Sequence, residues 1–371
     1  MQILGRVGSA LRPRALAFAA ALLLAACACP YRMYAEPVIY PWRIEPYAPW
    51  AVDARTARGA LAPEPAARLA VIGDVQRTSP LECCLGREVN DEEQRVLLAD
   101  LAAQKPAGVV LLGDMAFEAS IADWEHFDRL MAPLRADDAG HPLPTHFFPV
   151  LGNHDYSGYR WRVETEVGER FPGLLQSTHY SFEWGKVLMV VLDGNREQLC
   201  TVQPRNPRCQ PEWQAQLDWL RGQLLRADTD AELKGAIVFV HQSPYTRSPW
   251  VQKDQADARD FARALLASER GLALISAHAH GYERYAFNGE KADARGAKRF
   301  IVTAGGGGPR PSNPEPSEWP EDTHMPLPWP RPFNYLILEQ NQSGVRVRVH
   351  ALQKGERQVR ELEAESAWLS F

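Results

Sequence analysis

The stretch PVLGNHDYSG, residues 149–158, joins a short apolar run to a cluster of polar side chains. Gly152 ends the run, and Asn153, His154 and Asp155 follow it without interruption. Amide, imidazole and carboxylate groups lose favourable hydration when they are buried, unless another polar group satisfies them. A metal ion together with a phosphate would satisfy all three. The stretch therefore predicts a binding site at the end of a buried strand.

Apolar runs of similar length recur along the chain. Near-continuous apolar runs are typical of strands that are buried on both faces. The runs are LAVIG (69–73), GVVLLG (108–113), VLMVVLDG (187–194), GAIVFVH (235–241), LALISAH (272–278) and RFIVTAGGGG (299–308). Because amphipathic segments separate several of these runs, the sequence predicts an α/β layered domain.

Four amphipathic segments have the pattern of helices, at residues 90–104, 121–134, 211–227 and 254–269. In the first, Asn90 is predicted to cap the helix, and Glu93 three residues later would complete a capping box. Residues 333–353 alternate polar and apolar positions around a turn at 341–344, which predicts an antiparallel hairpin. The sheet system is therefore expected to be mixed.

Polar residues stand where the predicted strands end. In open α/β sheets, ligands bind in the crevice beyond the carboxyl ends of the strands. The sequence therefore predicts that one crevice gathers the side chains at five strand ends. These side chains are Asp74, Gln76, Asp114, Asn153, His241, His278 and His280.

This donor set has the chemistry of a metal centre. Imidazoles and carboxylates together suit Zn, Fe, Mn or Ni, and one bridging carboxylate would let the set hold two ions. A two-metal site can bind both the attacking and the leaving oxygen of a phosphoryl group. Each motif alone is a weak signal, because an aspartate after a strand is often only a turn or cap residue. The prediction depends on the ordered set.

The order GD…GD…GNHD…H…H-x-H resembles that of the calcineurin-like metallophosphoesterase superfamily, over about residues 69–352. The segments AHAHGYER (277–284), THYSFEWGKVLMVVLD (178–193) and EWQAQLDWL (212–220) further resemble its purple acid phosphatase branch. The resemblance implies two packed mixed β-sheets flanked by helices, two metal ions and hydrolysis of phosphoric esters.

The resemblance also implies a role for each residue of the set. Asp114 would bridge both ions, Asp74 and His280 would bind the first ion, and Asn153, His241 and His278 would bind the second. Gln76 stands where the superfamily usually has a histidine, and its neutral carbonyl oxygen is a weaker ligand. Phe117 stands where purple acid phosphatases usually have a tyrosine ligand, so a tyrosinate-to-iron colour is not expected. The identity of the metals, among Fe, Mn, Zn and Ni, stays open.

The remaining residues of the GNHD stretch are expected to act on the substrate. A metal-bound hydroxide would attack phosphorus in line, while His154 would stabilise the phosphoryl charge or protonate the leaving oxygen. Asp155 would orient His154, as carboxylates do for catalytic imidazoles. The alternative is that Asp155 caps the following segment.

The glycine-rich segment AGGGGPR, residues 304–310, has two interpretations. It would form either a backbone nest for phosphate or a turn that lets the chain approach the metals. Arg310 at its end would either contact substrate phosphate or pack at the surface.

The N-terminal segment has the pattern of a secretory signal, because arginines precede the apolar stretch ALAFAAALLLAACAC. It reaches LAAC at Cys27, which resembles the lipobox of bacterial lipoproteins; the alternative is an ordinary cleaved signal. We expect residues 1–26 to be removed and the protein to be exported to the bacterial cell envelope. A lipid on Cys27 would anchor it to the membrane, facing the periplasm. Residues 27–66 would form a tether and an irregular N-terminal wrap, and residues 67–371 the metallophosphoesterase domain.

Composition narrows the class of partner. The formal net charge is −5, which gives no support for a nucleic-acid-binding surface. The predicted function is a dinuclear-metal phosphoric ester hydrolase that favours phosphomonoesters over diesters. The alternative is a non-catalytic envelope lipoprotein that uses this fold as a binding or scaffolding module, for which Gln76 and Phe117 are the support.

Overall fold

The computed structural model describes residues 68–371 with gaps, the longest at residues 157–165, 197–208, 288–296, 311–320 and 324–330. The predicted signal, Cys27 and the predicted tether lie outside the described residues. Among the helices that are described, none combines the length and the apolar character needed to span a bilayer.

The first sheet contains three parallel strands, β1, β2 and β3, which are formed by the first three apolar runs of the sequence. Its order is β13-β12-β11-β1-β2-β3, with β14 paired to β12. The strands are β1 (Leu69–Ile72), β2 (Gly108–Leu112), β3 (His146–Val150), β11 (Phe333–Asn341), β12 (Gly344–Leu352), β13 (Arg360–Glu361) and β14 (Ala367–Ser370). β11 pairs antiparallel with both β1 and β12, so the predicted hairpin is confirmed and the sheet is mixed.

The second sheet has the order β10-β8-β9-β7-β6-β5-β4. Its strands are β4 (Tyr180–Trp184), β5 (Val187–Val191), β6 (Gly235–Phe239), β7 (Gly271–Ser276), β8 (Tyr282–Phe287), β9 (Lys298–Thr303) and β10 (Glu321–Thr323). β5, β6, β7 and β9 are parallel, while β4 and β8 join them antiparallel. Strand β5 is buried along its whole length, as its apolar run predicts.

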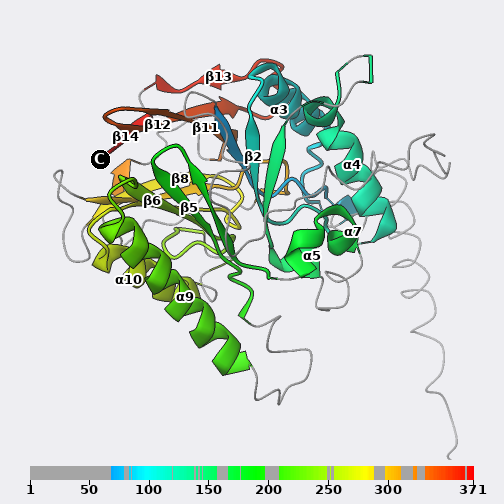
Figure 1. Ribbon diagram of the computed structural model, residues 1–371. Helices are drawn as coiled ribbons and strands as arrows, with labels where there is room; N and C mark the ends of the chain where they lie inside the picture. The colour runs from blue at the N-terminus through cyan, green and yellow to red at the C-terminus, as the bar shows by residue number, and fades with distance from the viewer. Residues whose placement is uncertain are drawn as a thin grey trace, which may run out of the picture.

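Helices flank the two sheets (Figure 1). Helices α3 (Asp91–Ala103) and α4 (Ile121–Arg135) lie beside the first sheet, and α9 (Cys209–Thr229) and α10 (Gln255–Ala267) beside the second. Shorter helical segments are α5 (Asn153–Tyr156), α7 (Gly168–Arg170) and the 3-10 turn at Pro172–Leu175. One apolar cluster includes side chains from both sheets, and a second lies between the second sheet and its helices. The predicted α/β fold of two packed mixed sheets flanked by helices is confirmed.

The predicted capping box at α3 is wrong. Asn90 is the N-cap residue, but its side chain makes no capping hydrogen bond. Its amide instead donates to the carbonyls of Gly307 and Gly308, at 3.1 and 3.2 Å. Glu93 pairs with Lys354 at 2.8 Å rather than with the N-cap backbone. The first turn of α3 is therefore used to hold the glycine-rich segment in place.

Candidate metal centre

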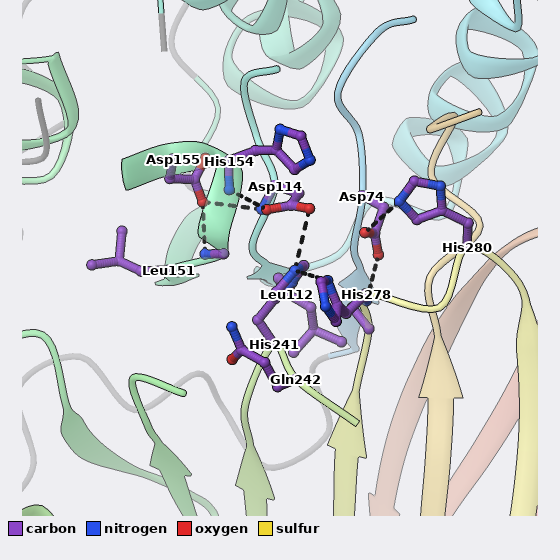
Figure 2. Close-up of polar contacts among 12 residues, drawn as sticks. Asp74, Leu112, Asp114, Leu151, His154, Asp155, His241, Gln242, His278 and His280 are labelled. Atoms are coloured by element: carbon purple, nitrogen blue, oxygen red, sulfur yellow. Dashed lines mark hydrogen bonds and ion pairs between the residues drawn. The ribbon is translucent and has the colours of Figure 1, made fainter. Parts of the chain in front are cut away.

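Two sheets contribute side chains to one site (Figure 2). Asp74, Asp114 and Asn153 follow strands of the first sheet, and His241, His278 and His280 follow strands of the second. Direct contacts join the two halves. The backbone N–H of His278 donates to Asp74 Oδ2 at 3.0 Å, and His241 Nε2 lies 3.2 Å from Asp114 Oδ2. The carboxyl ends of strands from both sheets therefore meet at this site.

The ligand atoms form two groups that share one carboxylate. Asp114, His241 and His278 place three potential ligand atoms within 4.8 Å of one another, and so do Asp74, Asp114 and His280. This partition matches the assignment of Asp114 as the bridge. The shared carboxylate is completely buried.

The oxygen atoms of this set fit cations rather than hydrogen-bond donors. Within the predicted donor set, four buried side-chain oxygens have no hydrogen-bond partner, namely Asp74 Oδ1, Gln76 Oε1, Asp114 Oδ2 and Asn153 Oδ1. An unsatisfied polar atom in a protein interior costs about 1–3 kcal/mol. They include the amide oxygens of Gln76 and Asn153, the two predicted ligands that are neither histidine nor carboxylate. Bound cations would satisfy them.

The histidines present acceptor nitrogens to the same space. His241 Nδ1 lies 2.6 Å from the Leu112 carbonyl, and His280 Nδ1 lies 2.8 Å from the Pro309 carbonyl. A carbonyl accepts only from a protonated nitrogen, so Nε2 is the nitrogen of each ring that can bind a metal ion, once the ion has displaced any proton on it. His278 Nδ1 lies 3.1 Å from His241 Nε2, which places two ring nitrogens against each other.

The backbone is held in an unfavourable conformation at four of these residues. Among the described non-glycine residues, positive φ occurs at Asp74 (56°), Lys105 (51°), Asp114 (52°), His278 (69°) and His280 (48°). Left-handed backbone costs about 1–3 kcal/mol per residue and persists only where the surrounding structure enforces it. The strain is therefore concentrated at predicted ligands, which it turns sharply into the crevice.

The electrostatics of the site favour positive charge. Burial disfavours protonation of His241, but the Asp114 carboxylate outweighs it and raises the pKa of His241 to about 10. Burial likewise opposes ionisation of Asp114, yet the neighbouring histidines hold its pKa well below the usual range. A pocket that stabilises a proton this strongly also attracts a metal ion, which competes with protons for the same atoms.

Close packing at the site requires two glycines. Gly113 has a φ of +83° and ends β2 directly before Asp114. A side chain on Gly152 would come within 2.2 Å of Asp114 Oδ1 and 2.3 Å of the Asp114 nitrogen. Gly113 thus permits a turn, whereas Gly152 permits the β3 end to approach the bridging carboxylate.

The expected pairing of Asp155 with the His154 ring is wrong. Asp155 Oδ2 accepts from the backbone N–H groups of Asp114 and Gly152, at 3.0 and 2.8 Å. Its Oδ1 accepts from Met115 at 2.9 Å and from Ala116 at 3.3 Å. Figure 2 shows the carboxylate facing the Asp114 backbone.

Asp155 instead fastens the β3 end to the loop after β2. Burial and the neighbouring Asp114 charge raise the pKa of Asp155 to about 7, and the N–H donors oppose that rise because they favour the ionised form. The alternative prediction is that Asp155 caps the following segment. It does not explain the bonds that Asp155 accepts from three backbone N–H groups in the loop after β2. Its carboxylate positions the backbone that carries Asp114.

His154 is oriented by a backbone carbonyl. Its Nδ1 lies 2.6 Å from the Phe117 oxygen, and the two rings are 5.0 Å apart. The backbone N–H of His154 donates to Asp114 Oδ1 at 2.9 Å. Nε2 is therefore the ring nitrogen that remains for a substrate. Phe117 thus acts on His154 through its main chain as well as through its ring.

The glycine-rich segment packs against the first ligand. The N–H groups of Gly306 and Gly308 donate to the carbonyls of Gly73 and Asp74, each at 2.9 Å. These amides are therefore not available as a phosphate nest, and the close-approach interpretation holds. Arg310 makes two bonds of 2.9 Å to Glu88 and lies over the Phe333 ring, so it is a packing arginine.

Sequence reasoning missed a buried polar group behind the site. Asp193, Asn195 and Gln242 are each at most 4% exposed. A signal was present, because the apolar run VLMVVLDG (187–194) also ends in an aspartate followed by a glycine. Of the cysteines, Cys83 is disulfide-bonded and Cys84 is free, whereas Cys27 and Cys200 lie outside the described residues.

Comparisons with known proteins agree with this geometry. A family model described as calcineurin-like phosphoesterase matches residues 67–282. No curated protein sequence matches the chain.

Three solved structures share the fold at low sequence identity. A dimetal phosphatase from Danio rerio has a TM-score of 0.54 at 16% identity, with 83% of this chain and 100% of that chain covered. GAP50, the anchor in the inner membrane complex of Plasmodium, has a TM-score of 0.51 at 14% identity, covering 82% and 88%. Purple acid phosphatase PPD1 from yellow lupin has a TM-score of 0.50 at 13% identity, covering 80% and 54%.

Proposed function

Because this chain belongs to the calcineurin-like phosphoesterase family, and is thus a metal-dependent phosphoesterase, we propose that it hydrolyses phosphomonoesters by in-line attack on phosphorus. The observation that carries the proposal is the set of four buried, unpartnered oxygens at the ends of β1, β2 and β3. Two of them, Asp114 Oδ2 and Asp74 Oδ1, lie 3.2 and 3.3 Å from Nε2 of His241 and His280, which follow strands of the other sheet.

The chain's own residues would divide the work of holding two cations. Asp74, Gln76, His280 and Asp114 supply atoms for the first ion, and Asp114, Asn153, His241 and His278 for the second. When bound, such ions activate water near neutral pH and stabilise the charge on a transferring phosphoryl group. Gln76 contributes a neutral oxygen, which favours harder ions such as Mn or Fe at the first position.

His154 is the proposed acid. Its bond to the Phe117 carbonyl fixes a proton on Nδ1 and directs Nε2 away from the backbone. A proton on Nε2 would pass to the leaving oxygen as the bond between that oxygen and phosphorus breaks. The oxygen of the attacking water bonds to phosphorus on the opposite face. General-acid catalysis of this kind contributes about 10²–10⁴-fold to the rate.

Preference for monoesters is supported by the purple-acid-phosphatase-like segments and by the fold shared with the lupin enzyme. The alternative is a non-catalytic scaffold; the Plasmodium protein with this fold is described as the anchor in the inner membrane complex. A scaffold needs no strained left-handed aspartates and no unpartnered buried oxygens. Both features favour the hydrolase.

Turnover of p-nitrophenyl phosphate and bis-p-nitrophenyl phosphate tests the proposal, with the protein loaded in turn with Mn, Fe, Zn and Ni. We expect hydrolysis of both, with the higher kcat/KM for the monoester. A higher kcat/KM for the diester would overturn the monoester preference. No turnover of either ester with any of the four metals would favour the scaffold.

Location in the cell envelope is a separate proposal, supported by the LAAC motif at Cys27. We propose that a lipid on Cys27 holds the protein at the membrane. Full-length protein should fractionate with membranes, and Cys27→Ser should release it. Equal fractionation of the two would exclude the anchor at Cys27.

A further inference from the structure

A chain of buried hydrogen bonds lies next to the second group of ligand atoms, that of Asp114, His241 and His278. None of the side chains in this chain of bonds is a predicted ligand. It begins at Tyr156, whose hydroxyl donates to Asp193 Oδ2. Asp193 Oδ1 accepts from the backbone N–H and the side-chain amide of Asn195, at 3.0 and 2.9 Å. Asn195 Oδ1 accepts from Gln242 Nε2 at 2.7 Å. These four residues, called here the Asp193 network, are at most 4% exposed.

The network ends beside two ligands that come from different sheets. Tyr156 lies in α5, the short helix that begins with Asn153. Gln242 directly follows His241 at the end of β6, and Figure 2 shows its side chain next to that histidine. Asn195 also donates to the Leu151 carbonyl at 2.8 Å, which fixes the β3 end just before α5. The network therefore links Asn153 to His241 across the junction between the sheets.

The centre of the network is itself fixed. Gln216 of α9 accepts from the Asp193 backbone N–H at 2.8 Å and donates to the Asp193 carbonyl at 2.9 Å. Gly194 lets Gln242 approach, since a side chain there would come within 1.9 Å of Gln242 Oε1. Asp193 thus has little freedom to move, and neither do the groups bonded to it.

We propose that Asp193 is a positioning residue that sets the separation of Asn153 and His241, and thereby the affinity of the second metal site. The inference rests on the proposed two-metal function. Residues behind metal ligands orient them, and losing such a residue typically costs about 10–100-fold in metal affinity. The first group, built on Asp74 and His280, has no bond to the network and should be unaffected.

Titration of the full chain with Mn²⁺ alone tests the proposal, without any substrate. Tyr156→Phe removes the hydroxyl that bonds to Asp193. We expect Mn²⁺ affinity at one of the two sites to fall about 10–100-fold, with the other site unchanged. The matched control is Tyr180→Phe, because the Tyr180 hydroxyl is also buried and donates to the Pro149 carbonyl of β3 at 3.0 Å. The control should bind both ions as the wild type does.

Gln242→Ala provides a second variant at the other end of the network, away from α5. It should weaken the same site, and it keeps the proposal testable if Tyr156→Phe does not fold. Wild-type affinity at both sites in either folded variant, or equal losses in Tyr156→Phe and Tyr180→Phe, would overturn the inference. Because metal binding is read directly, these outcomes are independent of whether the protein hydrolyses phosphoesters.

Discussion

At the scale of single residues, the site contains groups whose backbone conformation or lack of hydrogen bonds costs free energy. Asp74 and Asp114 combine left-handed backbone with an oxygen that has no hydrogen-bond partner. Both features lower the free energy of unfolding unless a bound ligand offsets their cost. Metal binding is the offset that the donor chemistry allows.

His154 is expected to affect turnover and not metal binding. In His154→Gln, the Nε2 proton is lost while Asp114 and its partners keep their positions. We expect kcat for p-nitrophenyl phosphate to fall about 10²–10⁴-fold, with metal content measured by elemental analysis unchanged. If metal content falls in parallel with kcat, His154 is part of the metal site instead.

Asp155 should behave in the opposite way. In Asp155→Asn, one carboxylate oxygen becomes an amide nitrogen, which faces N–H donors that it cannot satisfy. We expect the free energy of unfolding to fall by about 1–3 kcal/mol and metal affinity to fall with it. Chemical denaturation and metal titration measure the two. A variant with normal stability and metal content but low kcat would restore the catalytic pair with His154.

The contrast between these residues shows the limit of sequence reasoning at this scale. The ligand residue types and their order could be read from the chain, because metal chemistry restricts them to a few side chains. The partners of Asp155 could not, because they are backbone N–H groups about forty positions away that every sequence offers. The same holds for the Phe117 carbonyl that orients His154.

At the scale of elements, the site depends on strand ends that approach one another closely. Gly152, two residues after β3, lies beside the Asp114 carboxylate, where there is no room for a methyl group. The helix α5 begins directly afterwards and carries both Asn153 and His154. A small displacement of the β3 end would therefore move a ligand and the proposed acid together.

Gly152→Ala should disrupt the site through this contact alone. Its Cβ would lie 2.2 Å from Asp114 Oδ1, so the carboxylate or the β3 end must shift. We expect loss of bound metal and of turnover. Gly222→Ala is the control, since Gly222 lies in α9 with no atom within 4 Å of an added Cβ. That change should stabilise the protein by about 0.5–1 kcal/mol. Retention of two ions in Gly152→Ala would contradict the packing argument.

The apolar runs predicted most of the strands because burial on both faces requires continuous apolar sequence. Strand β8 escaped prediction because it carries Glu283 and Arg284, which are buried at 6% and 7% exposure. Strand β4 alternates buried and half-buried residues and has no continuous run. The capping box at Asn90 failed because tertiary contacts with Gly307 and Gly308 took its side chain.

At the scale of the whole molecule, the metal centre is one of the places where polar contacts join the two sheets. Four predicted ligands come from the first sheet and three from the second, and each group of ligand atoms draws on both sheets. Bound cations would therefore crosslink the halves of the fold. Global stability should depend on metal as strongly as activity does.

Chelation tests this dependence. Thermal unfolding after treatment with EDTA should begin at a lower temperature than unfolding of the metal-loaded protein. A site at one hundred times its dissociation constant contributes about 2.7 kcal/mol to the folded state. Asp114→Asn should show no response to EDTA. An unchanged transition in the wild type would mean that the fold is stable without metal crosslinks.

The most direct measurement for the central claim is the number of metal ions bound per chain in the wild type and in Asp114→Asn, by titration with Mn²⁺ and elemental analysis. We expect two ions in the wild type, and loss of metal together with loss of phosphoester hydrolysis in the variant. A wild type that binds fewer than two ions, or a variant that keeps both, would contradict a centre bridged by Asp114.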